Sequence, residues 1–434
     1  MRIAIIGTGY VGLVTGACFA DFGNQVYCVD RNRRRLKVLK KGKIPFYEPG
    51  VLELVHRNVQ AKRLAFSHQL SEIRPFPEII MLAVGTPPRK NGEADIDSAL
   101  DAARQIARVW AKQKSHPYFL IVTKSTVPAG TTEQIRDVVL DMGVPSESFS
   151  VASNPEFLRE GSAISDFLNP DRIVIGGDPG RAFDLLAELY RPLNAHLFFT
   201  SIRTAELVKY ASNAFLAMKI SFINEMAHIC ERLKLDVSEV SSALGLDKRI
   251  GQSFLNAGLG YGGSCLPKDV NALIRLSEKA GYSSRLLPVV NSINDSQTSW
   301  FAGKIVKKLR RVKGKRIAVL GLSFKPGTDD VRESPALKVL DALLKRGAKV
   351  KAYDPSSEKI AQTMFPKAQF CESVFDAIRG TDAIVVATDW PEFRELDLNQ
   401  VRRLARGALI FDGRNIFDPR KVRDAGIEYY GVGR

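Results

Sequence analysis

Short apolar runs alternate with segments of helical hydrophobic spacing along most of the chain. In the N-terminal part these runs lie at 2–6, 25–29, 78–84, 119–123 and 172–175. Continuous apolar runs separated by helical segments are typical of βαβ units, in which both faces of a parallel sheet are buried. The pattern therefore predicts one α/β domain over residues 1–198.

In the middle of the chain the hydrophobic spacing becomes helical over residues 204–235, which predicts one long helix, and a shorter apolar helix is expected over 270–280. A helix of this length usually forms a spine between domains or a subunit contact. Strand-like runs then return at 315–320, 349–353, 383–387 and 408–411, with a helix at 335–344. We expect two Rossmann-like, doubly wound parallel-sheet domains joined by a central helical spine. The expected boundaries are 1–198, 199–300 and 301–434.

Composition and cysteine usage narrow the class of protein. Hydrophobic residues make up 45% of the 434 residues and charged residues 25%, an ordinary globular balance. The five cysteines are scattered, which argues against a disulfide framework or a structural zinc site and for a reducing compartment. No apolar run reaches transmembrane length, and the N-terminus has the pattern of a strand. We expect a cytoplasmic protein with no metal and no membrane insertion.

The formal net charge is +16, from 63 basic and 47 acidic residues, with dense basic clusters at 31–37 and 304–316. Such an excess suits nucleic acid, an anionic membrane surface or polyanionic small molecules. Neither cluster is interleaved with aromatic residues as in single-strand binders, and the second has helical spacing. We interpret the second cluster as a solvated helix face, and the charge alone predicts no nucleic-acid partner.

A dinucleotide fingerprint follows the first predicted strand. Its residues are Gly7, Gly9, Tyr10, Val11 and Gly12. A helix and a second strand follow, and the second strand ends in Asp30, so the motif has its proper βαβ setting. Asp30 favours NAD over NADP because a carboxylate repels a 2′-phosphate, although the neighbouring Arg31, Arg34 and Arg35 leave NADP open.

The ends of further strands supply other candidate contacts, because ligands bind at the carboxyl edge of a doubly wound sheet. Thr86, Ser125 and Thr126 follow two such strands, and they could instead be plain turn residues. In the C-terminal domain the equivalent turn has lost two fingerprint glycines and gained Lys325. A basic residue there can pair with a phosphorylated ligand.

The stretch Gly260–Asp269 (GYGGSCLPKD) has the strongest candidate chemistry. Its glycines let the backbone approach a ligand closely, and Cys265 is followed by Lys268 and Asp269. Nucleophilic cysteines need an electropositive, partly open setting because the thiolate is the reactive form. The alternative is a glycine turn before a helix, with Cys265 as a small buried apolar residue.

Together these motifs resemble those of the nucleotide-sugar 6-dehydrogenases, the UDP-glucose/GDP-mannose dehydrogenase family, over essentially the full length. The motifs are the fingerprint with Asp30, Glu48-Pro49-Gly50, Lys124–Pro128, Asn154–Gly161, Glu206–Phe215, Gly260–Asp269, Phe324-Lys325, Asp330–Ser334 and Asp412-Gly413-Arg414. The resemblance implies two successive NAD-dependent oxidations at the sugar C6, from alcohol to aldehyde to acid. UDP-glucose is the expected substrate, and GDP-mannose or a UDP-N-acetylaminosugar is the alternative.

The resemblance also implies a role for each matching residue. Cys265 would be the nucleophile, holding the aldehyde as a thiohemiacetal and then as a thioester. The other catalytic residues that it implies are Lys209 and Asn213 for the developing oxyanion, and Asp269, Glu156 and Thr126 for the proton and the hydrolytic water.

Binding residues are implied in the same way. Besides the fingerprint and Asp30, the implied cofactor contacts are Arg35, Thr86, Ser125, Thr126, Glu160, Lys268 and Arg332. The implied UDP-sugar contacts are Phe157, Leu158, Glu160, Lys209, Asn213, Arg249, Phe254, Leu255, Asn256, Gly262, Phe324, Lys325 and Arg414. Arg249 resembles an arginine that reaches the substrate of a neighbouring subunit, which implies a homodimer or a higher homo-oligomer.

Two other functions fit parts of the sequence. A two-electron β-hydroxyacid or 6-phosphogluconate-type dehydrogenase shares the N-terminal fold and the helical spine, but it needs neither the cysteine nor residues 315–434. A basic, NAD-sensing nucleic-acid binder would fit the charge. It would bind nucleic acid with strong salt dependence and would turn over no sugar nucleotide.

Overall fold

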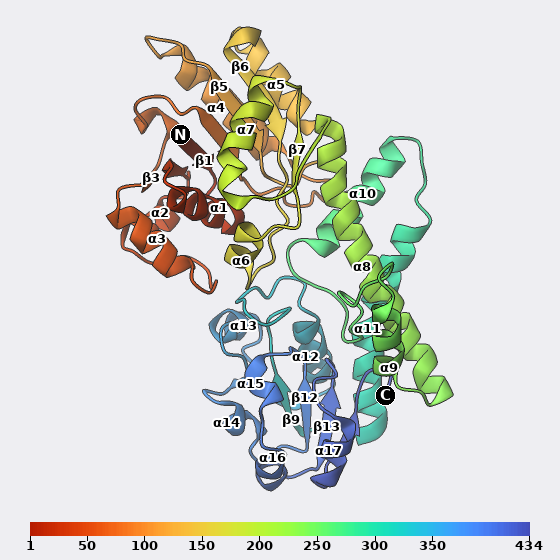
Figure 1. The fold of residues 1–434 in the computed structure, drawn as a ribbon. Helices are drawn as coiled ribbons and strands as arrows, with labels where there is room; N and C mark the ends of the chain where they lie inside the picture. Colours follow the sequence, from red (N-terminus) through yellow and green to blue (C-terminus); the bar gives the residue numbers. More distant parts are fainter. The chain divides into compact units, whose positions relative to one another are not determined.

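The computed structural model describes all residues from Met1 to Arg434 (Figure 1), and the chain divides into two compact units, Met1–Ser212 and Asn213–Arg434. Each unit contains one sheet with helices on both faces. The long helix α8 (Ile202–Leu233) contributes residues to both units. No helix combines the length and the apolar character that crossing a membrane requires.

The sheet of the first unit has eight strands in the order β3-β2-β1-β4-β5-β6-β7-β8. They are β1 (Arg2–Ile6), β2 (Gln25–Val29), β3 (Leu64–Ser67), β4 (Ile79–Leu82), β5 (Phe119–Thr123), β6 (Phe149–Ser153), β7 (Ile173–Gly176) and β8 (Leu197–Thr200). The first six have the doubly wound order, which confirms the predicted fold class. All pairings are parallel except that of β6 with β7, which meet only at Ser153 and Gly176.

Helices cover both faces of this sheet because its central strands are apolar on both sides. On β1, Ile3 and Ile5 face one core, whereas Ala4 faces the other. The first core is built with α1 (Tyr10–Asp21), α2 (Arg33–Lys40), α3 (Val51–Gln60), α6 (Ala163–Leu168) and α7 (Arg181–Tyr190). The second core is built with α4 (Asp97–Ala111) and α5 (Thr131–Asp141). The carboxyl ends of the parallel strands remain uncovered by these layers.

The second unit begins with helices and ends with a six-stranded parallel sheet in the order β11-β10-β9-β12-β13-β14. The strands are β9 (Arg316–Leu320), β10 (Lys349–Tyr353), β11 (Gln369–Phe370), β12 (Ala383–Val386), β13 (Leu409–Asp412) and β14 (Glu428–Tyr430). The helices after α8 are α9 (Val237–Leu246), α10 (Leu266–Lys279), α11 (Leu286–Leu309), α12 (Pro335–Lys345), α13 (Glu358–Met364), α14 (Val374–Ile378), α15 (Pro391–Arg394), α16 (Leu398–Leu404) and α17 (Pro419–Asp424).

The turn after β9 repeats the geometry of the first fingerprint in altered form. Gly321 has a φ of +92°, as Gly7 has +106°, and Asp354 follows β10 as Asp30 follows β2. The carboxylate of Asp354 accepts hydrogen bonds from the main-chain N–H groups of Leu322 (2.7 Å) and Ser323 (3.0 Å). The second sheet is therefore a Rossmann-like sheet with a different ligand-binding turn.

Two predictions about helices need correction. The helix expected over 270–280 is α10, which begins at Leu266, directly after Cys265, because the first turn of a helix accepts Pro267. The cluster 304–316 is not one solvated helix face, since α11 ends at Leu309. Within it, Lys304 is mostly buried, pairs with Glu231 and donates to the carbonyl oxygen of Gly431 (2.6 Å).

Candidate active site

The fingerprint turn has the geometry of a dinucleotide site. A Cβ at Gly12 would lie 1.9 Å from the carbonyl oxygen of Gly7, so the chain itself requires glycine there. At Gly9 a Cβ would meet nothing within 4 Å, which leaves open space for a ligand to approach. No side chain caps α1, so its first N–H groups remain available to an anion. The loop therefore fits the pyrophosphate of a dinucleotide.

Asp30 lies beside this loop and is 7% exposed. It accepts hydrogen bonds from the main chain (2.9 Å) and the hydroxyl (2.6 Å) of Thr8, and Arg35 Nη1 lies 3.0 Å from it. Burial raises its pKa, but these bonds and the N–H of Asn32 outweigh burial and hold the pKa of Asp30 below its usual range. Asp30 is therefore ionised beside the fingerprint turn, and its carboxylate pairs with Arg35. A carboxylate at this position favours NAD over NADP.

The predicted hydroxyl groups at the strand ends bind backbone carbonyls. Thr86 donates to the carbonyl oxygen of Thr126 (2.8 Å), and Ser125 donates to those of Val84 (2.7 Å) and Leu82 (3.1 Å). The turns after β4 and β5 are thus tied together. Thr126 itself is half-buried at the carboxyl edge of the sheet.

Glu48, which was not among the predicted site residues, organises the loop that carries the two candidate glutamates. Its carboxylate accepts hydrogen bonds from the Tyr10 hydroxyl (2.7 Å) and from the N–H groups of Gly161 and Ala163 (2.8 Å to the latter). Burial, with help from Glu48, raises the pKa of Tyr10 and keeps this hydroxyl a donor. Glu48 therefore connects the dinucleotide turn to the end of the segment Asn154–Gly161, on which Glu160 is partly exposed.

Glu156 and Lys209 form a buried ion pair in the first unit, with 3.4 Å between Lys209 Nζ and Glu156 Oε1. Glu156 also accepts a hydrogen bond from the N–H of Leu158 (2.6 Å), and Lys209 Nζ lies 5.2 Å from the centre of the Phe157 ring. Lys209 is only 4% exposed, so its ammonium group is buried and does not face the solvent. The structure therefore brings together four of the predicted residues, and the two for which the resemblance implies base and oxyanion roles, Glu156 and Lys209, are in direct contact.

Helix α8 is fixed at this point by Glu206, one turn before Lys209. Its carboxylate accepts hydrogen bonds from the N–H groups of Gly130 (2.6 Å) and Thr132 (2.8 Å), at the first turn of α5. Burial raises the pKa of Glu206 to about 7, although these hydrogen bonds favour the carboxylate and lower the pKa. Glu206 thereby joins the first turn of α5, which follows Thr126 in the sequence, to α8, the helix that carries Lys209.

Cys265 is exposed and occupies the N-cap position of α10, so the alternative of a buried apolar cysteine is wrong. Its Sγ lies 3.5 Å from the hydroxyl of Ser264. The N-terminus of a helix favours the thiolate, because unpaired N–H groups and the helix dipole stabilise negative charge there. Cys18 and Cys28 are buried, as expected for packing residues.

The glycine turn before Cys265 packs tightly on the second unit's own turn. A Cβ at Gly262 would lie 2.3 Å from the carbonyl oxygen of Glu333, and one at Gly263 would lie 2.8 Å from the ring of Phe324. The guanidinium of Arg414 donates to the carbonyl oxygens of Ala387 (2.9 Å), Phe324 (3.2 Å) and Gly260 (3.3 Å). Burial lowers the pKa of Arg414. Arg414 therefore holds the glycine turn in place by donating to a main-chain carbonyl oxygen of that turn, the one of Gly260.

Asp269 is fully buried one turn after Cys265 and accepts a hydrogen bond from Asn213 Nδ2 (2.6 Å). Lys268 forms an ion pair with the same carboxylate. Asn213 lies four residues after Lys209 on α8, so both side chains occupy the same face of that helix. The second unit therefore places Cys265, Asp269, Lys268 and Asn213 at the start of α10.

The remaining predicted residues are more dispersed. Lys325 Nζ lies 5.5 Å from the centre of the Phe324 ring, and Phe254 has a φ of +67° beside the buried Leu255 and the exposed Asn256. Arg249 is 88% exposed and pairs with Asp247 (2.6 Å), and Arg332 pairs with Asp330 (2.7 Å). The main-chain carbonyl oxygen of Arg332 accepts a hydrogen bond from the N–H of Gly263 in the glycine turn (2.9 Å).

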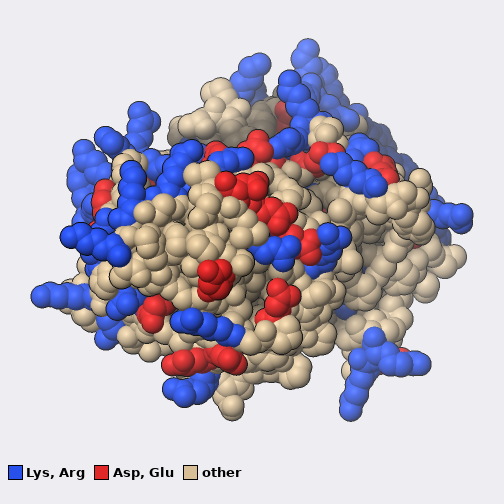
Figure 2. Space-filling model, turned by 90° about the horizontal axis from the view of Figure 1, so that it is seen from above, with Lys and Arg blue, Asp and Glu red and all other residues tan.

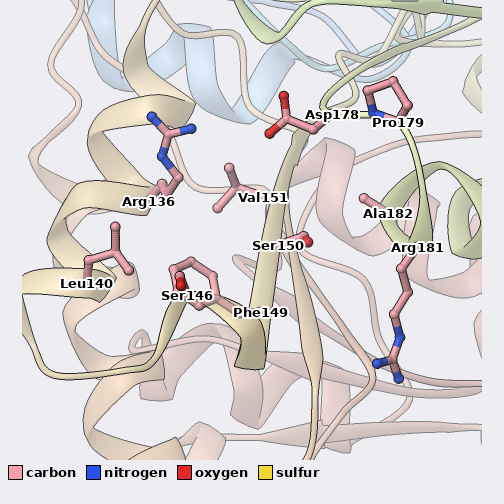
Figure 3. A pocket seen from close by; sticks show the side chains of 10 residues that line it. All are labelled: Arg136, Leu140, Ser146, Phe149, Ser150, Val151, Asp178, Pro179, Arg181 and Ala182. Atoms are coloured by element: carbon pink, nitrogen blue, oxygen red, sulfur yellow. The ribbon is translucent and has the colours of Figure 1, made fainter.

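The first unit also contains a pocket that the sequence did not predict (Figure 3). Its volume is about 200 Å³, and Arg136 of α5 and Arg181 of α7 lie on opposite sides of β6, next to Phe149, Ser150 and Val151. Phe149, Ser150 and Val151 are the first three residues of β6. Thr126 and Glu156 instead come after the carboxyl ends of β5 and β6. The pocket therefore lies apart from the Glu156–Lys209 pair.

The basic excess is spread over the surface on the face drawn in Figure 2, with acidic side chains among the lysines and arginines. No cluster of three or more histidine, cysteine, aspartate or glutamate side chains is arranged to hold a metal ion.

Residues 1–194 match the NAD binding domain of the UDP-glucose/GDP-mannose dehydrogenase family, residues 203–296 its central domain and residues 318–419 its UDP binding domain. The chain belongs to this family. It is an NAD-dependent oxidoreductase with a UDP binding domain, which confirms the predicted family, enzyme class and cofactor. The predicted domain boundaries lie close to the matched ranges and remain a prediction.

Individual relatives span the whole chain. A UDP-glucose 6-dehydrogenase of Bacillus subtilis is 45% identical over 434 residues, covering 100% of this chain and 93% of the relative. One of Rhizobium meliloti is 44% identical, with 100% of both chains covered. The solved UDP-glucose dehydrogenase of Pyrobaculum islandicum superposes with a TM-score of 0.91 at 40% identity, covering 100% of this chain and 97% of the other. A UDP-D-ManNAc dehydrogenase of Pyrococcus horikoshii reaches 0.86 at 29% identity, with 100% and 99% covered.

Proposed function

We propose that this enzyme is a cytoplasmic UDP-glucose 6-dehydrogenase, which oxidises UDP-glucose at C6 to UDP-glucuronate in nucleotide-sugar metabolism. The observation that supports this choice of sugar is the full-length identity of 40–45% with relatives named for that reaction, against 29% for the UDP-D-ManNAc dehydrogenase. GDP-mannose or a UDP-N-acetylaminosugar remains the alternative substrate.

The overall reaction consumes one alcohol, two NAD⁺ and one water, and it gives one carboxylate, two NADH and three protons. NAD, bound on the fingerprint turn, supplies the capacity to accept a hydride in each oxidation. In the first oxidation, Lys209 and Asn213 stabilise the negative charge that develops on the C6 oxygen as the alcohol loses its proton and its hydride. We infer that Lys325 binds a phosphate of the substrate.

Cys265 then makes the second oxidation feasible. Its thiolate adds to the aldehyde carbon, forming a C–S bond, and the aldehyde oxygen becomes the hydroxyl of a thiohemiacetal. Loss of that hydroxyl proton and of the remaining C6 hydride gives a thioester. We infer that Asp269, which is buried beside Asn213, accepts that hydroxyl proton.

Hydrolysis releases the product. We infer that Thr126 holds a water and that Glu156 accepts its proton as the water adds to the thioester carbon. The C–S bond then breaks, the thiolate of Cys265 leaves, and the sugar acid departs as a carboxylate. The buried position of Glu156 beside Lys209 supports this assignment.

The stoichiometry of the reaction tests this proposal. We expect each UDP-glucose to yield two NADH and no free aldehyde, because the cysteine keeps the aldehyde covalently bound between the two oxidations. NADH absorbance is recorded with a small panel of UDP- and GDP-sugars, and aldehyde is trapped with a hydrazide. One NADH per sugar with accumulating aldehyde would exclude the thiohemiacetal from the mechanism. Faster turnover of GDP-mannose than of UDP-glucose would show that GDP-mannose is the preferred substrate.

We further infer that the enzyme forms a homodimer through α8. Phe215, Phe222 and Ile229 recur every seven residues on this helix, and their exposed fractions are 59%, 44% and 43%. Three large apolar side chains in one exposed row are typical of an interface between subunits. The exposed Arg249 belongs to the same unit, and in a dimer it could reach the substrate of the second subunit.

A charge placed in this row is expected to separate the subunits. In sedimentation, the wild-type enzyme should have about twice the 48.0 kDa mass of one chain, and Phe222→Glu should sediment as a single chain. Val59→Glu on α3, at a position that is 42% exposed, is the matched control and should remain dimeric. A Phe222→Glu enzyme that keeps the doubled mass would exclude this row as the interface.

A further inference from the structure

A buried lysine that the mechanism leaves unused lies within electrostatic range of Glu156 and Lys209. Lys124 directly follows β5, and its side chain is only 5% exposed. Its Nζ donates hydrogen bonds to Asn154 Oδ1 (3.0 Å) and to the hydroxyl of Tyr190 (3.2 Å). Both of these partners are neutral, which is an unusual environment for a buried ammonium group.

The partners of Lys124 are themselves fixed. The Tyr190 hydroxyl donates to Asn154 Oδ1 (2.5 Å), and Asn154 Nδ2 donates to the carbonyl oxygen of Val174 (2.8 Å). The main-chain N–H of Asn154 donates to the carbonyl oxygen of Thr123 (2.9 Å). Asn154 lies two residues before Glu156, so Lys124 helps to hold the start of the segment that presents this carboxylate.

The charges around Lys124 come from two other segments. Burial lowers the pKa of Lys124 to about 8, the carboxylate of Glu156 opposes this shift, and the ammonium of Lys209 on α8 adds to it. Tyr190 on α7 is the other titratable neighbour, and burial raises its pKa, so its hydroxyl stays neutral. Two ammonium groups therefore act on one buried carboxylate, Lys209 by direct pairing and Lys124 through longer-range attraction, and the group carries one excess positive charge.

We propose that Lys124 is a positioning residue for the oxidation: its ammonium group balances the carboxylate of Glu156, so that the charge of Lys209 remains directed to the substrate oxygen. The inference rests on the proposed function, in which Lys209 stabilises that oxygen. Without the second ammonium group, Lys209 and Glu156 neutralise each other. The oxyanion then meets no excess positive charge.

This role makes turnover depend on pH. As the pH rises through about 8, Lys124 loses its proton and the buried group loses its excess charge. The rate constant kcat should therefore fall on the alkaline side, while KM for the UDP-sugar changes little. Removing the charge by mutation should reproduce the alkaline state of the wild-type enzyme at every pH.

The experiment measures kcat and KM for UDP-glucose against pH in Lys124→Met and Lys124→Arg. Lys124→Met should lower kcat at neutral pH by about ten- to a hundredfold, with no alkaline fall and with KM within about twofold. Lys124→Arg should keep most of kcat and extend it to higher pH, because a guanidinium stays protonated. The exposed Lys112→Met should behave as the wild type, and Tyr190→Phe should keep the alkaline fall.

Several results would overturn the inference. One is a Lys124→Met enzyme with wild-type kcat, and another is one whose kcat still falls above about pH 8. If Lys124→Met does not fold, the test is the comparison of kcat against pH in the wild-type enzyme and in Lys124→Arg. An identical alkaline fall of kcat in both would exclude Lys124 as its cause. Failure of the proposed function is separate, since it would appear in the wild-type enzyme as one NADH per sugar.

Discussion

Turnover of UDP-glucose to the acid is expected to fall by at least about a thousandfold when Cys265 is replaced by alanine. Without the thiol, the second oxidation must proceed from a hydrated free aldehyde, which no residue of the turn is placed to generate. Cys265 is exposed, so its truncation leaves no cavity and the fold should persist. NADH absorbance measures turnover, and calorimetry should show unchanged affinity for UDP-glucose and NAD.

Ser264→Ala is the matched control for this variant. It removes the hydroxyl 3.5 Å from Cys265 Sγ and leaves the thiol in place, so most of the turnover should remain. If Cys265→Ala keeps the wild-type rate, the cysteine has no covalent role, and the oxidation of the aldehyde depends on another group.

Replacing Glu156 by glutamine is expected to trap the thioester. Glutamine has nearly the same shape but cannot accept the proton of the attacking water, so hydrolysis should slow by about a hundredfold or more while both oxidations proceed. After mixing with UDP-glucose and excess NAD, intact-mass measurement should show a sugar-nucleotide adduct on most of the enzyme. A rapid release of two NADH per active site should precede the slow phase.

The double variant Cys265→Ala/Glu156→Gln provides the control, because it has no thiol to carry the adduct. Digestion of the trapped protein should place the added mass on the peptide that contains Cys265. A Glu156→Gln enzyme with normal turnover and no adduct would show that another group activates the water.

The strand pattern made much of the fold predictable. Strands β2, β5 and β10 lie at their predicted residues, because continuous apolar runs bounded by polar residues are required when a strand is buried on both faces. The start of α10 was missed because Pro267, Lys268 and Asp269 interrupt the apolar spacing. The antiparallel contact of β7 with β6 was missed because hydrophobic runs do not encode strand direction.

The site was predictable where a motif is local and unpredictable where it is assembled from distant segments. Cys265 and the fingerprint could be predicted from residues next to them in sequence. Glu48 binds the N–H of Ala163, 115 residues away, and Lys124 binds Tyr190, 66 residues away. No spacing rule connects such pairs, so their roles become visible only when the sheet brings the segments together.

The glycines of the fingerprint are not interchangeable as signs of cofactor binding. Gly12 is imposed by the chain, since any side chain there would collide with Gly7, whereas Gly9 faces open space and is imposed only by the ligand. The second unit illustrates the difference: it keeps Gly321, where a side chain would collide with Thr388, but has Ser323 two residues later. A related chain that loses the dinucleotide can therefore change position 9 first and still fold, so this single residue is the one to inspect when an inactive paralogue is suspected.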